Sequence, residues 1–177
     1  MEQNFERILF RENEIKDRIK ELANQINIDF QNQENVLFVP IMDGSLIFAG
    51  ELLLNLDFNL EVRSTKISSY ALSKITSGDP KILTPFTKEF VENKNIILVD
   101  DLIDTGHTLR MFIDYLKLLG ANSVKVCVLF NKLVKERQKE VTLDYVGFDI
   151  PDEWVAGFGV DSQEQFRNFR HFGIVKK

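Results

Sequence analysis

The chain has 177 residues, of which 44% are hydrophobic and 28% are charged, so it can bury one sizeable core and is neither disordered nor fibrous. Its formal net charge of −5 argues against a nucleic-acid surface as the main function and fits work on small molecules. We therefore expect a single domain that covers residues 1–177.

The first third of the chain predicts a helix, a buried strand, a second helix and a further strand. Asn13 can cap the first helix, in which four aliphatic residues up to Ile26 share one face. An apolar run over 36–41 predicts the buried strand, and the second helix follows at about 46–54. The alternating pattern of residues 60–65 predicts a strand with one buried face.

The middle of the chain contains one segment without periodicity, followed by a strong pattern. Residues 68–88 carry Gly78, two prolines and little apolar order, a composition typical of a functional lid or of disorder. A central strand is then predicted from Asn95, and a helix over 109–119, where the apolar residues have helical spacing.

The last third of the chain predicts mainly strands. Residues 124–130 form an apolar run, residues 132–140 a charged connection, and strands are expected around 145–148, 154–160 and 172–175. Strands that alternate with helices predict an α/β fold with a doubly wound, mostly parallel sheet and helices on both faces.

The single cysteine and the N-terminus indicate the compartment. Cys127 lies in an apolar run, where a buried thiol is expected, so no disulfide framework exists and a reducing compartment is favoured. The first residues contain no apolar signal segment, and the longest apolar stretch, 46–56, is interrupted by Glu51. We expect a cytoplasmic protein without a membrane-spanning segment.

The stretch from Asn95 to Leu109 joins a buried strand to an acidic pair and a turn of small hydrogen-bond donors. Asp100 and Asp101 stand at the carboxyl end of the strand, where ligands of open α/β sheets bind. The turn precedes a helix, so its backbone N–H groups form an anion site. The residues of this turn are Thr105, Gly106, His107 and Thr108. The stretch predicts a site for a phosphorylated sugar. Its carboxylates would accept hydrogen bonds from the ribose hydroxyls or hold a hydrated Mg²⁺.

Three other interpretations compete for this stretch. A strand that ends in Val-Asp-Asp also occurs in receiver domains and in the Walker B segment of nucleotide triphosphatases. The chain contains no Gly-Lys dipeptide and hence no Walker A loop, and a receiver carries its acidic pair near the start of the domain. The third interpretation is an ordinary strand–helix turn, which suits a lone Asp-x-x-Asp better than the full string.

The stretch resembles the phosphoribosyl-pyrophosphate motif of the type I phosphoribosyltransferases. A second segment, Asp43-Gly44-Ser45 between a buried strand and a helix, resembles the pyrophosphate-binding loop of that family. Hypoxanthine-guanine members usually carry Lys or Arg where this chain has Asp43, so the resemblance leaves the backbone N–H groups of Gly44 and Ser45 as the expected donors. A plain strand–helix turn stays open as the alternative for this loop.

The C-terminal run from Val146 to Asp161 closely resembles the purine-binding segment of the hypoxanthine-guanine phosphoribosyltransferases. The resemblance implies a small hood built mainly from residues 145–177. In it, Trp154 is expected to stack on the base and the backbone of Val155 to read the edge of the base. A core tryptophan is the alternative for Trp154 considered alone.

The same resemblance implies roles for two charged residues and a lid. Asp161 matches a second magnesium-linked carboxylate, and Arg167 matches the arginine that grips the pyrophosphate. The mobile lid is expected at about residues 67–88, where Ser69 and Tyr70 match the Ser-Tyr pair of the family.

The implied reaction is purine salvage, in which the phosphoribosyl group of phosphoribosyl pyrophosphate (PRPP) moves to N9 of hypoxanthine, and also of guanine. The resemblance implies that Lys132 donates to the C6 oxygen of the base and that Asp104 is the catalytic general base at N7. Mg²⁺ is the expected cofactor, linked to Asp100, Asp101 and Asp161. The products are the nucleoside 5′-monophosphate and pyrophosphate.

Two other functions stay open. One is transfer to xanthine or another purine, since the polar contacts to the base are few. The other is a catalytically idle nucleotide sensor that binds RNA, which should show a basic face and no purine segment. The expected partners are PRPP and a 6-oxopurine, with no nucleic acid and no membrane, and the habit of the family implies a homodimer or homotetramer.

Overall fold

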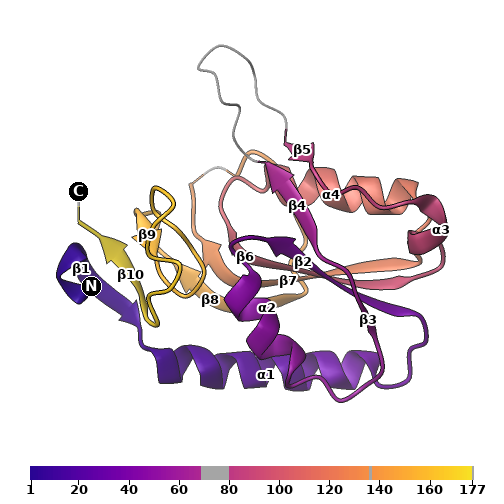
Figure 1. Cartoon of the computed structure of the whole chain (residues 1–177), viewed down its shortest axis with the longest axis horizontal. Coiled ribbons are helices and arrows are strands. Elements are labelled where there is room, and N and C mark those ends of the chain that lie inside the picture. Colours follow the sequence, from indigo (N-terminus) through magenta and orange to yellow (C-terminus); the bar gives the residue numbers. More distant parts are fainter. Residues whose placement is uncertain (69–79, 136, 177) are drawn as a thin grey trace, which may run out of the picture.

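The computed structural model describes residues 1–68, 80–135 and 137–176, which form a main sheet, a small sheet and flanking helices (Figure 1). Within these residues the main sheet has seven strands and the small sheet has three. In chain order the elements are a short 3₁₀ helix Glu2–Asn4, β1 Phe5–Phe10, α1 Glu12–Phe30, β2 Val36–Met42, α2 Leu46–Leu53, β3 Glu61–Val62, β4 Thr65–Ser68, β5 Lys81–Ile82, α3 Lys88–Val91, β6 Asn95–Ile103, α4 His107–Leu118, β7 Ser123–Lys132, β8 Tyr145–Ile150, β9 Val155–Ala156 and β10 Phe172–Val175.

The main sheet is parallel at its centre and follows the order β5-β4-β2-β6-β7-β8, with β3 also paired to β2. Among the described strand pairs of this sheet, the pair of β4 and β5 is antiparallel and all the others are parallel. The chain order reverses between β2 and β6, since β3 and β4 lie on one side of β2 and β6, β7 and β8 on the other. The crevice outside the carboxyl ends of two such strands is where ligands of doubly wound folds bind.

Alternate residues of the central strands face two different layers of helices. On one face α1 and α2 pack against side chains that include Phe38, Val99 and Cys127. On the other face α3 and α4 cover side chains that include Val39 and Leu98, and Figure 1 shows the helices on the two sides of the sheet. A strand buried on both faces needs apolar residues at every position, which explains the unbroken apolar runs of the sequence. The predicted doubly wound α/β fold is therefore confirmed.

The small sheet lies at one end of the molecule, near both chain termini (Figure 1). It pairs β1 with β10 and β10 with β9, all antiparallel. The predicted hood region 145–177 supplies β9 and β10, whereas β1 comes from the N-terminus, where no strand was predicted. Stacked aromatic rings join this sheet to the main one, with centroids 3.7 Å apart for Phe130 and Phe172 and 4.0 Å apart for Phe10 and Phe148.

The first helix begins two residues earlier than a cap at Asn13 allows. Arg11 is the cap residue of α1, and its backbone N–H donates a 2.8 Å hydrogen bond to Oε2 of Glu14. Asn13 therefore lies in the first turn, because a reciprocal contact from Glu14 competes with any single polar cap. No helix in the described parts of the chain is both long and apolar enough to cross a membrane.

Two predicted strands are shorter than their patterns indicate. The alternating residues 60–65 contribute only β3 and the start of β4; β3 pairs with the first half of β2, and both of its residues are exposed. The predicted strand 154–160 keeps only β9, since Gly157 and Gly159 have positive φ values of 109° and 102° and turn the chain out of the sheet.

Candidate active site

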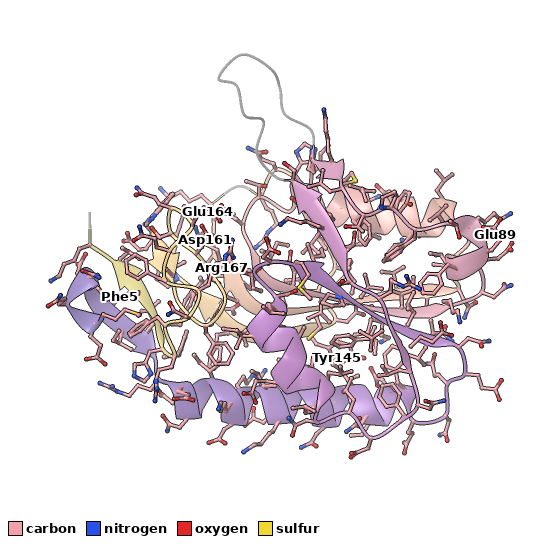
Figure 2. All side chains as sticks on the ribbon, viewed as in Figure 1. Phe5, Glu89, Tyr145, Asp161, Glu164 and Arg167 are labelled. Carbon is pink, nitrogen blue, oxygen red and sulfur yellow. The ribbon has the colours of Figure 1, made fainter. Side chains whose placement is uncertain are left out.

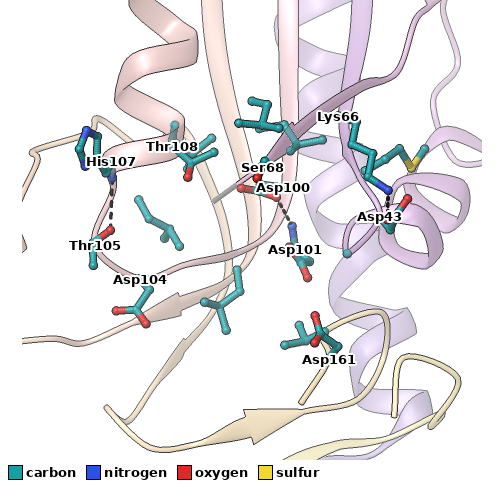
Figure 3. A pocket seen from close by; sticks show the side chains of 18 of the residues that line it. Asp43, Lys66, Ser68, Asp100, Asp101, Asp104, Thr105, His107, Thr108 and Asp161 are labelled. Atoms are coloured by element: carbon teal, nitrogen blue, oxygen red, sulfur yellow. Dashed lines mark hydrogen bonds and ion pairs between the residues drawn. The ribbon is translucent and has the colours of Figure 1, made fainter. Parts of the chain in front are cut away.

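A cavity of about 660 Å³ lies at the carboxyl ends of β2, β4 and β6 (Figure 3). Its described lining comes from four separate stretches, within residues 41–44, 66–68, 100–109 and 160–167, with Leu83 in addition. The predicted sugar-phosphate motif, the predicted pyrophosphate loop and part of the predicted hood therefore meet at one cavity. This cavity occupies the switch point at which the chain order of the sheet reverses.

The acidic pair lies inside β6, which continues to Ile103. Asp100 is only 8% exposed, and its Oδ1 accepts a 3.1 Å hydrogen bond from the backbone N–H of Asp101. Burial, and next the negative charge of Asp101, raise the pKa of Asp100 well above its usual range. Burial also raises the pKa of Asp101, although hydrogen bonds and the positive charge of Arg167 oppose this shift. A cation bound at the pair would stabilise both carboxylates in their charged form.

The turn that follows the acidic pair forms the N-terminus of α4. Gly106 is the cap residue of this 12-residue helix and has a φ of +79°, a left-handed conformation that favours glycine. A methyl group on Gly106 would overlap the carbonyl oxygen of Lys139, whose backbone N–H donates a 3.1 Å hydrogen bond to the carbonyl oxygen of Thr105. Figure 3 shows Thr105, His107 and Thr108 together at this end of the cavity. The helix terminus thus offers backbone donors to an anion.

Lys132 and Asp104 form an ion pair at the edge of the cavity. Lys132 is the last residue of β7, and its side chain is 11% exposed, so it is not the solvated lysine of a charged connection. Its Nζ donates a 3.1 Å hydrogen bond to Oδ2 of Asp104, which lines the cavity. An acceptor and a donor therefore stand side by side next to the anion-binding turn.

The hood contributes an arginine and its carboxylate partners (Figure 2). Arg167 places Nη2 at 2.6 Å from Oδ1 of Asp161 and at 3.9 Å from Oε2 of Glu164. Its Nη1 donates a 2.9 Å hydrogen bond to the carbonyl oxygen of Gly159. A methyl group on Gly159 would overlap the carbonyl oxygen of Gly44, so the hood loop is in direct contact with the loop after β2.

In the loop after β2, Asp43 lines the cavity and Ser45 is buried. Asp43 forms an ion pair with Lys66 of β4, with 2.5 Å between Oδ2 and Nζ. The peptide bond between Met42 and Asp43 is cis. Ser45 is buried, and its hydroxyl donates a 2.6 Å hydrogen bond to the carbonyl oxygen of Ile41, so this hydroxyl is not a free ligand donor.

Comparison with known proteins identifies the family. Residues 8–163 match the family of phosphoribosyl transferase domains. The chain belongs to the phosphoribosyltransferase family. A hypoxanthine-guanine phosphoribosyltransferase of Streptococcus pyogenes is 36% identical over 177 residues, which cover 100% of this chain and 97% of the relative. One of Streptococcus thermophilus is 34% identical with the same coverage.

Solved structures agree with this assignment. A hypoxanthine phosphoribosyltransferase of Staphylococcus aureus has a TM-score of 0.90 and 30% identity, and covers 99% of this chain and 94% of that one. A hypoxanthine-guanine phosphoribosyltransferase of Bacillus anthracis has a TM-score of 0.86 and 31% identity, with coverage of 97% and 98%. The predicted family, its fold and its activity, phosphoribosyl transfer in purine salvage, are confirmed.

Some predicted contacts of this phosphoribosyltransferase lie away from the described lining of the main cavity. Trp154 is 56% exposed, its Nε1 donates a 2.8 Å hydrogen bond to Oγ of Ser162, and it borders a second cavity of about 560 Å³. Val155 is buried in β9. Ser69 and Tyr70 fall outside the residues that the structure describes. The base contacts and the lid stay predictions.

Two residues near the site carry no signal in the sequence that points to it. Lys66 lines the cavity from β4, between the predicted strand 60–65 and the predicted lid 67–88. Arg137 belongs to the charged run after Lys132, yet its Nη2 donates hydrogen bonds to the Oδ1 of Asn131 at 2.6 Å and to the carbonyl oxygen of Lys132 at 3.0 Å. Its Nη1 is buried without a hydrogen-bond partner among the described residues. Lys66 becomes recognisable only from its contact with the distant Asp43, and Arg137 only from the folded geometry of the connection after β7.

Proposed function

We propose that the chain transfers the 5-phosphoribosyl group from PRPP to N9 of hypoxanthine, and also of guanine, with release of pyrophosphate. The observation that carries this proposal is the 3.1 Å pair of Lys132 and Asp104, beside the anion-binding turn 105–108. An ammonium group only donates hydrogen bonds and a carboxylate only accepts them, so the pair is complementary to a C6 carbonyl next to a protonated N7. The amino group of adenine would place a donor against the ammonium group.

We assign each part of PRPP to residues that line the cavity. The 5′-phosphate is assigned to the Thr105–Thr108 turn, because backbone N–H groups at the N-terminus of α4 attract an anion. The ribose hydroxyls are assigned to Asp100 and Asp101, whose oxygens accept hydrogen bonds. The pyrophosphate is assigned to the backbone of Gly44 and to the guanidinium of Arg167, which suits bidentate contacts with phosphate oxygens.

The acids of the cavity fit a magnesium ion. No closed set of three or more His, Cys, Asp or Glu ligands occurs in the described residues. Mg²⁺ suits such an open arrangement, because it commonly uses one or two protein carboxylates together with water and substrate phosphates. We assign its protein contacts to Asp100, Asp101 and Asp161. When bound, Mg²⁺ neutralises the pyrophosphate and makes it a better leaving group.

In the proposed reaction the bond between ribose C1′ and the pyrophosphate oxygen breaks, and the bond between C1′ and N9 forms. Positive charge develops on the ribose, as in other glycosyl transfers, close to the carboxylates of Asp100 and Asp101. Asp104 accepts the proton of N7 as the base is alkylated, and Lys132 holds the C6 oxygen. Arg167 retains the departing pyrophosphate.

A panel of labelled bases with PRPP tests the proposal. Hypoxanthine and guanine should give labelled 5′-monophosphates, and adenine should give none. Xanthine belongs in the panel because a hypoxanthine-guanine-xanthine phosphoribosyltransferase shares 30% identity with this chain and covers 99% of it. Turnover of xanthine but of no other base would refute the proposed specificity for hypoxanthine and guanine. Asp104→Asn should lower kcat at least about 100-fold, and full turnover in this variant would refute the general-base role.

A further inference from the structure

The ion pair of Asp43 and Lys66 joins two separate elements at the cavity wall. Asp43 follows β2, Lys66 lies in β4, and their Oδ2 and Nζ atoms are 2.5 Å apart. Both side chains line the cavity and are about half exposed, at 54% for Asp43 and 50% for Lys66. An ion pair this exposed contributes little to stability, about 0–1 kcal/mol, so stability is a poor explanation for the pair.

The backbone of Lys66 is held firmly in place. Its N–H donates a 3.0 Å hydrogen bond to Oγ1 of Thr84, and its carbonyl oxygen accepts a 2.7 Å hydrogen bond from the N–H of Leu83. The neighbouring residue Ile67 pairs with Ile82 of β5. The ammonium group therefore projects into the cavity from a fixed base, and Asp43 engages only one of its three donors.

The charges of the cavity make this ammonium group important. Of the described lining residues, six have carboxyl side chains and two, Lys66 and Arg167, have ammonium or guanidinium side chains. Arg167 is already bound by Asp161 and by the carbonyl oxygen of Gly159 on the hood side. A cavity this acidic repels a pyrophosphate group unless cations accompany it, so each resident cation counts.

The position of the pair matches one end of PRPP. Figure 3 shows Asp43 and Lys66 at one side of the cavity and the Thr105–Thr108 turn at the other. PRPP carries its 5′-phosphate and its pyrophosphate at opposite sides of the ribose. With the 5′-phosphate at the turn, as the proposed function requires, the pyrophosphate lies toward the pair.

We propose that Lys66 of β4 binds the pyrophosphate group of PRPP from the side of the β2 loop, and that Asp43 positions its ammonium group for this contact. The loop itself then supplies backbone donors and the Asp43 carboxylate, which holds the ammonium group. The ammonium group comes from Lys66 on the neighbouring strand β4. This inference rests on the proposed function, because it presumes PRPP as the substrate.

Steady-state kinetics of Lys66→Met test the assignment. The KM for PRPP should rise about tenfold or more, because a hydrogen bond to a charged group is lost, while the KM for hypoxanthine stays within about twofold. Lys88→Met is the matched control, since Lys88 is an exposed lysine paired with Glu92 on α3, outside the described cavity lining. This control should keep both KM values of the unaltered protein.

A rescue variant separates charge from local structure. Asp43→Lys combined with Lys66→Met returns a cation to the same point from the loop, and it should recover most of the lost affinity for PRPP. A Lys66→Met protein with an unchanged KM for PRPP overturns the inference. So does an equal rise in both KM values, or the absence of rescue. If the unaltered protein forms no nucleotide with any base, the proposed function fails instead, and the two failures are thereby distinguished.

Discussion

Gly106→Ala is expected to weaken both the fold and the binding of the substrate phosphate. Gly106 has a φ of +79°, and a non-glycine residue in a left-handed conformation costs about 1–2 kcal/mol. The added methyl group also overlaps the carbonyl oxygen of Lys139. Relief of this overlap displaces the backbone that donates to Thr105, at a cost of about 1 kcal/mol for the lost hydrogen bond. The free energy of unfolding should therefore fall by about 2–3 kcal/mol.

Urea unfolding and steady-state kinetics measure the two effects of Gly106→Ala separately. The KM for PRPP should rise about tenfold or more, because the displaced turn no longer aims its N–H groups at the 5′-phosphate. The KM for hypoxanthine should change less, since no base contact is assigned to the turn.

The matched control for this experiment is Gly50→Ala. Gly50 lies in α2, and a methyl group there meets no atom within 4 Å. Alanine is the better helix former, so the free energy of unfolding should rise by about 0.5–1 kcal/mol while both KM values stay unchanged. A Gly106→Ala protein with the stability and the KM for PRPP of the unaltered protein would refute the role of this turn.

Two further predictions concern the polar contacts of Tyr145 and Arg137. The hydroxyl of Tyr145 donates a 2.5 Å hydrogen bond to Asp29, and this bond is the first cause of the lowered pKa of Asp29. A carboxylate with a lowered folded pKa adds stability above its unfolded pKa of about 3.9, and this stability is lost as the pH falls through the folded pKa. Tyr145→Phe should thus shrink the difference in unfolding free energy between neutral and acidic pH, and an unchanged difference would contradict this cause. Arg137→Met removes the hydrogen bonds to Asn131 and to the carbonyl oxygen of Lys132. The KM for hypoxanthine should therefore rise about tenfold, with little change in the KM for PRPP. Equal changes in both KM values would show a general loss of structure instead.

The sequence by itself determined the parts of the site that are contiguous in the chain. The apolar run of β6, the pair Asp100 and Asp101, and the turn around Gly106 occupy consecutive positions, so local physics sets their order. A strand buried on both faces, followed by small residues and an amphipathic helix, specifies a ligand site at a strand end without knowledge of the rest of the fold. Local cues are weaker where several polar residues compete, which is why Arg11 and not Asn13 is the cap residue of α1.

Only the tertiary structure decided which distant residues complete the site. Lys132 reaches Asp104 across 28 positions, Lys66 reaches Asp43 across 23, and β1 joins β10 from the opposite end of the chain. These contacts depend on which strands are neighbours and in what register they pair, and a one-residue slip would turn each side chain to the other face. Crossover connections between parallel strands set that arrangement, and the periodicity of a single segment does not encode it.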